Sequence, residues 1–97
     1  MGGAATVESV KAALGTAVRR HRAQLQLTQE ELAEAADLAL RYVQDVEAGR
    51  ANATLAVLVA LANALGVRAE ELLKPARLSP PRRGRPRGIA EKRPRRP

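Results

Sequence analysis

The chain has 97 residues, which leaves room for one domain, since domains usually span about 50 to 250 residues, and makes a multi-domain enzyme an unfavoured interpretation. It holds no cysteine, a single histidine and a single aromatic residue, which excludes disulfides, thiolate metal sites and an aromatic platform for stacking single-stranded bases. The net charge is +7, yet basic and acidic residues balance over residues 1–78, so the whole excess lies in residues 79–97.

The first predicted helix covers residues 7–24. Apolar residues recur there at spacings of three and four, which is typical of a helix with one buried face. That face is expected to hold Val7, Val10, Leu14, Ala17, Val18, His21 and Leu25. Because a lone histidine on an apolar face is more often a packing residue than a ligand, His21 is not expected to bind a metal.

The second predicted helix follows Thr28 and ends near Ala36. Thr28 and Glu31 are spaced as a capping box, in which each side chain bonds the amide of the other, and Leu27 can pack on Leu32 as a hydrophobic staple. Asp37 is expected to take the left-handed turn conformation. A third helix then covers residues 40–48 and is stopped by Gly49.

A fourth helix is expected after Thr54, which can cap its start, and Gly66 ends it. A brief fifth helix over residues 69–74 should offer Leu72 and Leu73 to the core. The apolar face of the fourth helix is expected to comprise Leu55, Leu58, Leu61, Ala62 and Leu65. With no alternating strand pattern, the sequence predicts a compact all-α domain of five helices over residues 7–74.

Residues 75–97 are predicted to be a disordered basic tail rich in proline and arginine. Five of the six prolines lie within residues 79–97, where Ile89 is the single large aliphatic side chain, so too little apolar surface is present to offset chain entropy. No apolar run approaches the roughly 20 residues of a membrane-spanning helix, and residues 1–6 lack the basic start of a signal peptide. A soluble, cytoplasmic, nucleoid-associated protein is expected.

Residues 29–48 carry a helix-turn-helix pattern. Such helices cross at roughly 90 to 120 degrees, which requires a small residue at Ala33, while Val43 and Val46 would bury the back of the second helix. The wider sequence, residues 14–73, resembles the phage-repressor and Cro-like (XRE) helix-turn-helix family. The stretches that carry the resemblance are Leu27-Thr28-Gln29-Glu30-Glu31-Leu32-Ala33, Tyr42-Val43-Gln44-Asp45-Val46-Glu47-Ala48-Gly49-Arg50 and Leu61-Ala62-Asn63-Ala64-Leu65-Gly66-Val67.

Four positions depart from the family pattern. Asp37 stands where the turn usually has glycine, and Ala53 where proline is common. Ala39 and Arg68 stand where serine or threonine usually caps a helix. Since each missing cap costs about 1 kcal/mol, a domain of moderate stability is expected.

The resemblance implies that the third helix lies in the major groove of double-stranded DNA and that its outward side chains touch base edges. Arg41 could bond guanine, Gln44 could pair with adenine, and Leu40 could contact a thymine methyl group. Asp45 could accept a hydrogen bond from cytosine, although a carboxylate near phosphates often holds a neighbouring arginine or excludes wrong bases instead. Solvated helix residues without a base contact are the alternative for all four.

Phosphate contacts are implied at two places, the start of the second helix with Thr28 and Gln29, and the loop after the third helix with Arg50 and Asn52. For Thr28, a role as a helix cap without any phosphate contact is an equally good interpretation.

Other residues are assigned to the fold by the same resemblance. Arg22 and Glu47 align with a structural salt bridge of the family, and Tyr42 is expected to pack at the domain edge, with a phosphate contact through its hydroxyl as the alternative.

The tail contains a short match to the core of an AT-hook. Glycine lets such a backbone lie deep in a narrow minor groove, and the flanking arginines follow its negative potential. A plain polycation that neutralises phosphates without preference is the alternative, and the tail could also meet RNA, a protein or an anionic lipid. The residues concerned are Arg82, Arg83, Gly84, Arg85, Pro86 and Arg87.

These features favour a sequence-specific DNA-binding transcription regulator of the repressor type, acting as a homodimer through the fourth and fifth helices, with the tail adding affinity. One alternative is an antitoxin-like protein whose tail folds on a protein partner. Another is an architectural DNA binder that acts through the tail. An enzyme is not expected, because the sequence lacks a phosphate-cradling glycine loop, a nucleophile motif and a metal cluster, and no cofactor is expected either.

Overall fold

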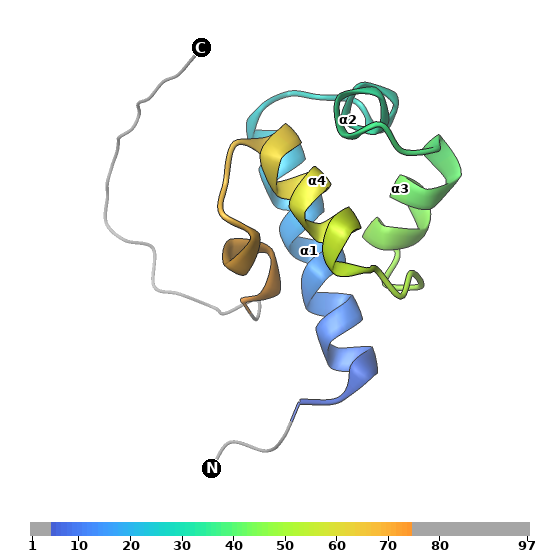
Figure 1. Ribbon diagram of the computed structural model, residues 1–97, viewed down its shortest axis with the longest axis vertical. Coiled ribbons are helices and arrows are strands. Elements are labelled where there is room, and N and C mark those ends of the chain that lie inside the picture. The colour runs from blue at the N-terminus through green and yellow to red at the C-terminus, as the bar shows by residue number, and fades with distance from the viewer. Residues whose placement is uncertain (1–4, 75–97) are drawn as a thin grey trace.

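A computed structural model describes residues 5–74, and within them the protein is entirely helical (Figure 1). The elements are α1 (Val7–Gln24), α2 (Gln29–Ala36), α3 (Leu40–Glu47), α4 (Leu55–Leu65) and the 3-10 helix η1 (Ala69–Leu73). The all-α prediction is confirmed. No helix of this part is long and apolar enough to cross a membrane. The division into a domain over 7–74 and a tail over 75–97 stays a prediction, since the tail lies outside the described residues.

The fifth predicted helix is not an α-helix. Over Ala69–Leu73 the backbone forms a five-residue 3-10 helix, closed by a bond from the Glu71 amide to the Arg68 carbonyl at 2.9 Å. Arg68 gives no side-chain cap to this segment. A single short turn without a cap does not offset the cost of nucleating an α-helix, which accounts for the tighter form.

The helix starts follow the cap residues. The hydroxyl of Thr28 accepts from the Glu31 amide at 3.0 Å, while the Glu31 carboxylate accepts from the Thr28 amide at 2.8 Å, so the predicted capping box is confirmed. Thr54 caps α4 through the Val57 amide. Ala39 gives α3 no side-chain cap, in line with its departure from the family pattern.

The helix ends follow the residues that tolerate a left-handed backbone. Asp37 closes α2 with φ of 59° and Gly66 closes α4 with φ of 72°, both as predicted. Gly49 has φ of 77°, which turns the chain sharply after α3. Gln26 also has a left-handed backbone, with φ of 59° in the turn between α1 and α2, and no pattern in the sequence predicted it.

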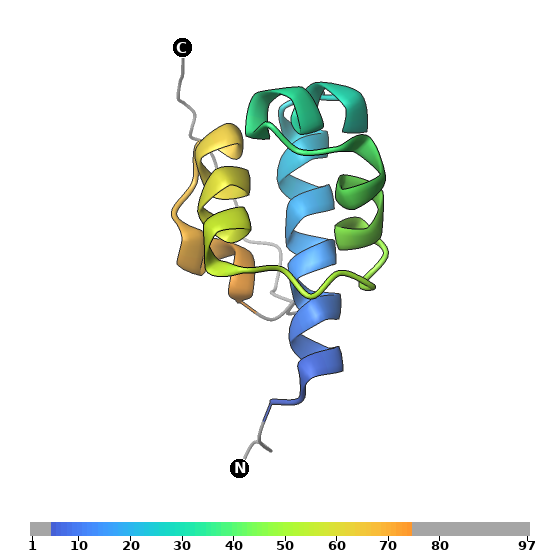
Figure 2. The same ribbon diagram turned by 45° about the vertical axis from the view of Figure 1, so that its right-hand side comes forward.

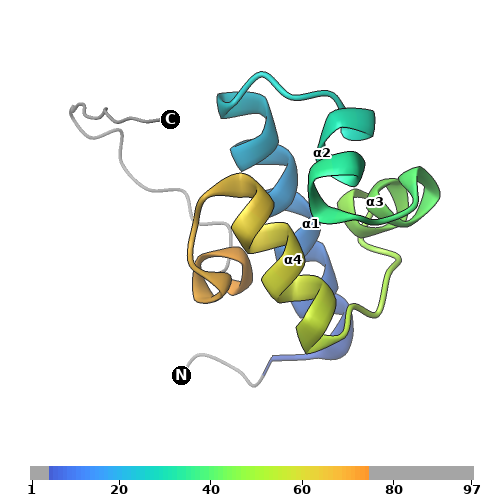
Figure 3. The same cartoon turned by 45° about the horizontal axis from the view of Figure 1, so that its top comes forward.

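Helix α1 runs through the middle of the fold. Helix α3 lies to one side of it, while α4 and η1 lie to the other, and α2 packs against both α3 and α4, as Figures 2 and 3 show from two directions. Every element therefore contributes to one shared core. Its buried residues are Leu14, Ala17, Val18, Leu32, Ala33, Ala36, Val43, Val46, Ala51, Leu58, Leu61, Ala62, Leu65 and Leu72.

Five residues predicted to be buried are exposed instead. Val7 and Val10 lie on the first turns of α1, which project beyond the packed helices (Figure 2), and Leu25 follows the other end of that helix. Leu55 and Leu73 lie at the ends of short elements and are 79% and 41% exposed. Apolar periodicity identified the correct helix face, but it could not show where the neighbouring helices stop.

Gly15 brings α1 against the end of α3. A Cβ atom at this position would lie 2.5 Å from the carbonyl oxygen of Val46 and 2.8 Å from that of Glu47. One turn later, Arg19 donates to the same Glu47 carbonyl at 3.5 Å. The absence of a side chain at Gly15 thus sets the distance between the central helix and α3.

His21 is half-buried on α1, and its Nε2 atom has no hydrogen-bond partner in the described residues. Burial of the imidazole lowers the pKa of His21 below its ordinary value of about 6.5, and Arg20 lowers that pKa further while Glu71 partly raises it. The folded state therefore prefers the neutral imidazole.

Burial of the neutral His21 imidazole is accordingly expected to make the free energy of unfolding fall in acid. Above about pH 6.5 the contribution is complete, because His21 is neutral whether the chain is folded or not. As the pH falls from there through the lowered pKa of the folded state, the unfolded chain binds more protons and the domain loses stability. Urea unfolding at pH 7.5 and pH 5 should show a larger loss for the wild type than for His21→Gln. Equal losses would mean that the imidazole is not buried as described.

Candidate nucleic-acid interface

The two sides of α3 differ in exposure. Val43 and Val46 are completely buried against the core, as the helix-turn-helix pattern predicted. Arg41 and Gln44 are exposed on the opposite side, and Leu40 is half-buried at the start of the helix. The structure therefore holds the back of α3 rigidly and presents the candidate base-reading side chains to solvent.

A buried ion pair fixes the far end of α3. The Arg22 Nε and Nη2 atoms donate to the two carboxylate oxygens of Glu47 at 2.6 and 2.9 Å, which confirms the predicted salt bridge. The Nη1 atom of Arg22 also donates to the Leu27 carbonyl at 2.8 Å. The hydrogen bond to Glu47 raises the pKa of the guanidinium, although burial opposes the rise. A bidentate pair of this kind has both strength and a fixed direction.

The same carboxylate reaches α2. The side-chain amide of Gln29 donates to Glu47 at 3.0 Å, so this bond draws the start of α2 toward the end of α3. Arg50 follows three residues after Glu47 and is exposed. The two segments predicted to contact phosphates therefore lie near each other, although the Gln29 side chain is engaged within the protein.

The start of α2 keeps backbone donors for an anion. Thr28 satisfies the amide of Glu31, whereas the first amides of a helix, here those of Gln29 and Glu30, have no acceptor within the helix. Such amides, together with the positive end of the helix dipole, attract phosphate oxygens. Any phosphate contact by Gln29 is thus expected through its backbone amide.

Asp45 lies between two exposed arginines. Its Oδ1 atom is 2.9 Å from the Nη2 atom of Arg50 and 3.6 Å from the Nε atom of Arg41. The Asp45 side chain itself is only 28% exposed. The structure therefore connects a candidate base reader, Arg41, to a candidate phosphate contact, Arg50, through one acid.

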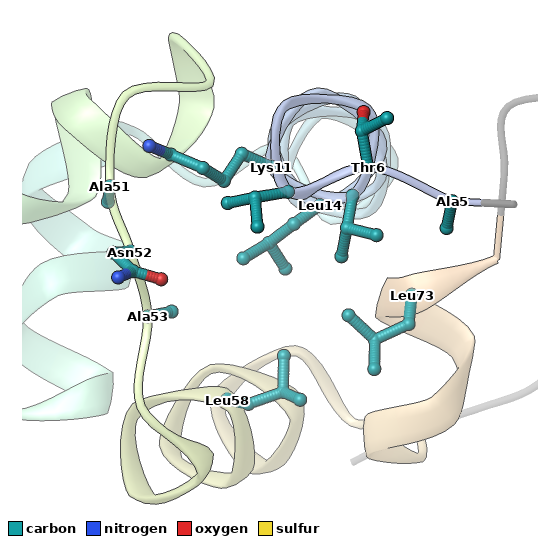
Figure 4. Close-up of a pocket in the computed structure, with 11 residues that line it drawn as sticks. Ala5, Thr6, Lys11, Leu14, Ala51, Asn52, Ala53, Leu58 and Leu73 are labelled. Carbon is teal, nitrogen blue, oxygen red and sulfur yellow. The ribbon is translucent and has the colours of Figure 1, made fainter.

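Asn52 is exposed in the loop after α3 and borders a hollow of about 350 Å³ (Figure 4). The hollow lies between the start of α1, this loop, α4 and η1, and its walls are mostly apolar. The residues that line it are Ala5, Thr6, Val7, Val10, Lys11, Leu14, Ala51, Asn52, Ala53, Leu58 and Leu73. Asn52 stays a candidate phosphate contact. It also lies at the edge of an apolar hollow that the sequence did not indicate.

Three further expectations concern Tyr42, the AT-hook-like segment and metal binding. Tyr42 packs, half-buried, against the core, as predicted. Residues 82–87, the AT-hook-like segment, lie outside the described residues. Within residues 5–74, no cluster of three or more histidine, cysteine, aspartate or glutamate side chains could hold a metal ion.

Sequence reasoning missed two contributors to the interface. Gly15 lies inside a helix, where glycine is unfavourable by about 1 kcal/mol relative to alanine. A glycine at such a position was the one sign in the sequence that another part of the backbone comes close there. Arg19 has no role assigned from the sequence, yet its side chain reaches the end of α3. Gly15, Arg19 and Arg22 follow one another at spacings of four and three on α1 and all meet Glu47.

Comparison with known proteins agrees with this geometry. Residues 18–72, more than half of the chain, match the helix-turn-helix family. The chain belongs to this family. It is similar to an immunity repressor protein of Bacillus phage phi105, with 37% identity over 60 residues that cover 62% of the chain and 42% of that protein. This match spans less than half of the phage repressor's length.

Two solved structures share the fold. The restriction-modification controller protein C.AhdI from Aeromonas hydrophila has 35% identity and a TM-score of 0.62, covering 64% of this chain and 94% of its own. The clp gene regulator ClgR from Corynebacterium glutamicum has 34% identity and a TM-score of 0.63, covering 66% and 68%. The family match, the phage immunity repressor and these two structures together identify the chain as a helix-turn-helix protein of the phage-repressor type.

Proposed function

We propose that the protein represses transcription by binding a specific operator as a dimer, with α3 in the major groove. The observation that carries the proposal is the exposure of Arg41 and Gln44 on a helix whose opposite side, at Val43 and Val46, is fully buried. An α-helix held this way fits the width of the major groove. The start of α2 and the loop at Arg50, which lie near each other at the end of α3, would then meet the DNA backbone beside the groove.

A second copy is proposed to bind through α4 and η1. Leu55 and Val59 lie one turn apart on α4 and are 79% and 49% exposed, an unusual exposure for large apolar side chains on one helix face. Leu73 is exposed on η1, which packs against α4. Two copies would bury these side chains and place two α3 helices on successive half-sites, about one helical turn apart.

Selection and sequencing of genomic DNA fragments bound by the full-length chain at about 150 mM salt tests the proposal, since non-specific binding is weak at that concentration. A two-fold-symmetric motif, together with a dimeric molar mass from light scattering, is expected. Recovery of unpatterned or only A·T-rich fragments would contradict it and would favour the architectural alternative, in which residues 79–97 dominate binding.

Arg41→Ala is expected to lose discrimination at one base pair of each half-site. Loss of a bidentate contact to guanine costs about 1 to 3 kcal/mol at that position and leaves the others intact. Arg20→Ala is a matched control, because Arg20 is exposed on α1, outside both α3 and the proposed dimer surface, and belongs to no ion pair among residues 5–74. Competition binding with single-base variants of the motif measures the effect. An equal loss on all sequences would assign Arg41 to the phosphates.

The basic tail is proposed to add affinity without setting the preferred sequence. Residues 79–97 carry eight basic residues and a single acidic one, and each phosphate contact steepens the slope of log K against log salt by roughly 0.9. In the same selection, a chain ending at residue 78 should retain the motif while binding more weakly and with a shallower salt slope.

A further inference from the structure

Asp45 is held on both sides by groups that the proposed function assigns to DNA. Its carboxylate pairs with Arg41 one turn earlier on α3 and with Arg50 beyond the Gly49 turn. The Asp45 carbonyl also accepts the Arg50 backbone amide at 2.8 Å. Backbone and side chain of one residue thus fix Arg50, while the side chain alone steadies Arg41.

The contact with Arg41 is made at one particular atom. The Nε atom of Arg41 lies 3.6 Å from the carboxylate, which makes an ion pair without a hydrogen bond, and no hydrogen bond within residues 5–74 uses the two terminal nitrogens of this guanidinium. Those two nitrogens form the fork that can bond guanine O6 and N7 together. An arginine held in this way loses less side-chain entropy on binding than a free one.

The charge of Asp45 has a second consequence. Arg41 and Arg50 are 80% and 65% exposed, and without the acid both would attract the phosphates of any DNA. A carboxylate between them competes with phosphates for both guanidinium groups and repels the backbone itself. Phosphates alone would then not compensate for breaking these ion pairs, whereas DNA that also offers guanine O6 and N7 to Arg41 would.

From these contacts we infer that Asp45 is a positioning and specificity-determining residue, which orients Arg41 for base reading and weakens binding to unrelated DNA, and which does not read a base itself. The inference rests on the proposed function, since it needs a preferred sequence against which unrelated DNA is compared.

Asp45→Asn in the full chain tests the inference, with Glu34→Gln as a matched control. Glu34 is exposed on α2 and belongs to no ion pair among residues 5–74, so its change removes the same charge away from the arginines. Asp45→Asn is expected to bind unrelated DNA more tightly and to reduce the ratio of specific to unrelated binding by about tenfold, the range of one good base contact. The control should leave that ratio nearly unchanged.

The Arg41→Ala background separates the two possible roles of the acid. If Asp45 acts through Arg41, its substitution should remove preference at the same base pair as Arg41→Ala, and adding Asp45→Asn to Arg41→Ala should cost no further discrimination. Loss of preference at a different base pair, or a further loss in the double variant, would overturn the inference in favour of direct reading. An unchanged ratio in Asp45→Asn would overturn it as well.

Two further measurements keep this failure distinct from failure of the proposed function. A wild-type chain with no sequence preference would sink the proposed function, and the inference with it, before any variant is compared. In the free protein, the Nε–Hε signal of Arg41 in NMR spectra should shift in Asp45→Asn and stay in place in Glu34→Gln. If the Arg41 signal does not shift in Asp45→Asn, the ion pair between Arg41 and Asp45 is contradicted, whatever the DNA-binding results.

Discussion

Replacing Gly15 by alanine is expected to lower the free energy of unfolding by about 1 to 3 kcal/mol or more, the usual cost of forcing an extra group into a well-packed contact. The new Cβ would lie 2.5 Å from a backbone oxygen of α3, and a backbone atom cannot rotate away as a side chain can. Thermal unfolding should register the loss as a drop of roughly 4 to 8 °C in Tm per kcal/mol. Because α3 must move to make room, specific DNA binding should weaken even at temperatures where the variant is folded.

Gly66→Ala provides the contrast for this experiment. Gly66 has φ of 72°, and a Cβ atom added there would have no neighbour within 4 Å, so alanine meets backbone strain of about 1 to 2 kcal/mol and no clash. That variant should lose stability while keeping its sequence preference. Alanine in an open helix would stabilise the domain relative to glycine, so an unchanged or higher Tm for Gly15→Ala would show that α1 and α3 are not in close contact.

Replacing Arg22 by alanine is expected to cost about 3 to 5 kcal/mol, the penalty for leaving a buried charge without its partner. The Glu47 side chain is 4% exposed and would retain only the Gln29 amide, while the Leu27 carbonyl would lose its donor. Small domains have a total stability of about 5 to 15 kcal/mol, so the loss removes a large share of the free energy of unfolding. Urea unfolding followed by circular dichroism measures the change.

The double variant Arg22→Met, Glu47→Leu separates charge from packing. Apolar replacement of both partners of a buried pair is often neutral or stabilising, so this variant should recover most of the stability lost by Arg22→Ala. It should not recover the approach of Gln29 to α3, which depends on the Glu47 carboxylate. A loss below about 1 kcal/mol for Arg22→Ala would be that of an exposed surface pair and would contradict the burial described.

Local chemistry explains why so much of the fold could be predicted. The starts of α2 and α4 and the left-handed ends at Asp37 and Gly66 depend on a few adjacent residues, and their preferences act within one turn of helix. The buried faces of α3 and α4 followed from periodicity for the same reason. The fifth helix was wrong in type because a five-residue segment has no repeat from which an α-helix can be distinguished from a 3-10 helix.

The sequence by itself determined the helices, the helix-turn-helix pattern and the uneven charge, because caps, periodicity and composition are properties of neighbouring residues. The tertiary structure alone decided which apolar residues remain exposed, such as Leu55, and why a glycine stands inside α1 at Gly15. It also decided that Arg50 turns back to Asp45 beyond the Gly49 turn, whereas the Arg41–Asp45 pair, one turn apart on α3, already follows from helix spacing. Each of these tertiary facts depends on where separate segments meet or end, and the residue pattern within one helix does not specify how close its neighbours lie.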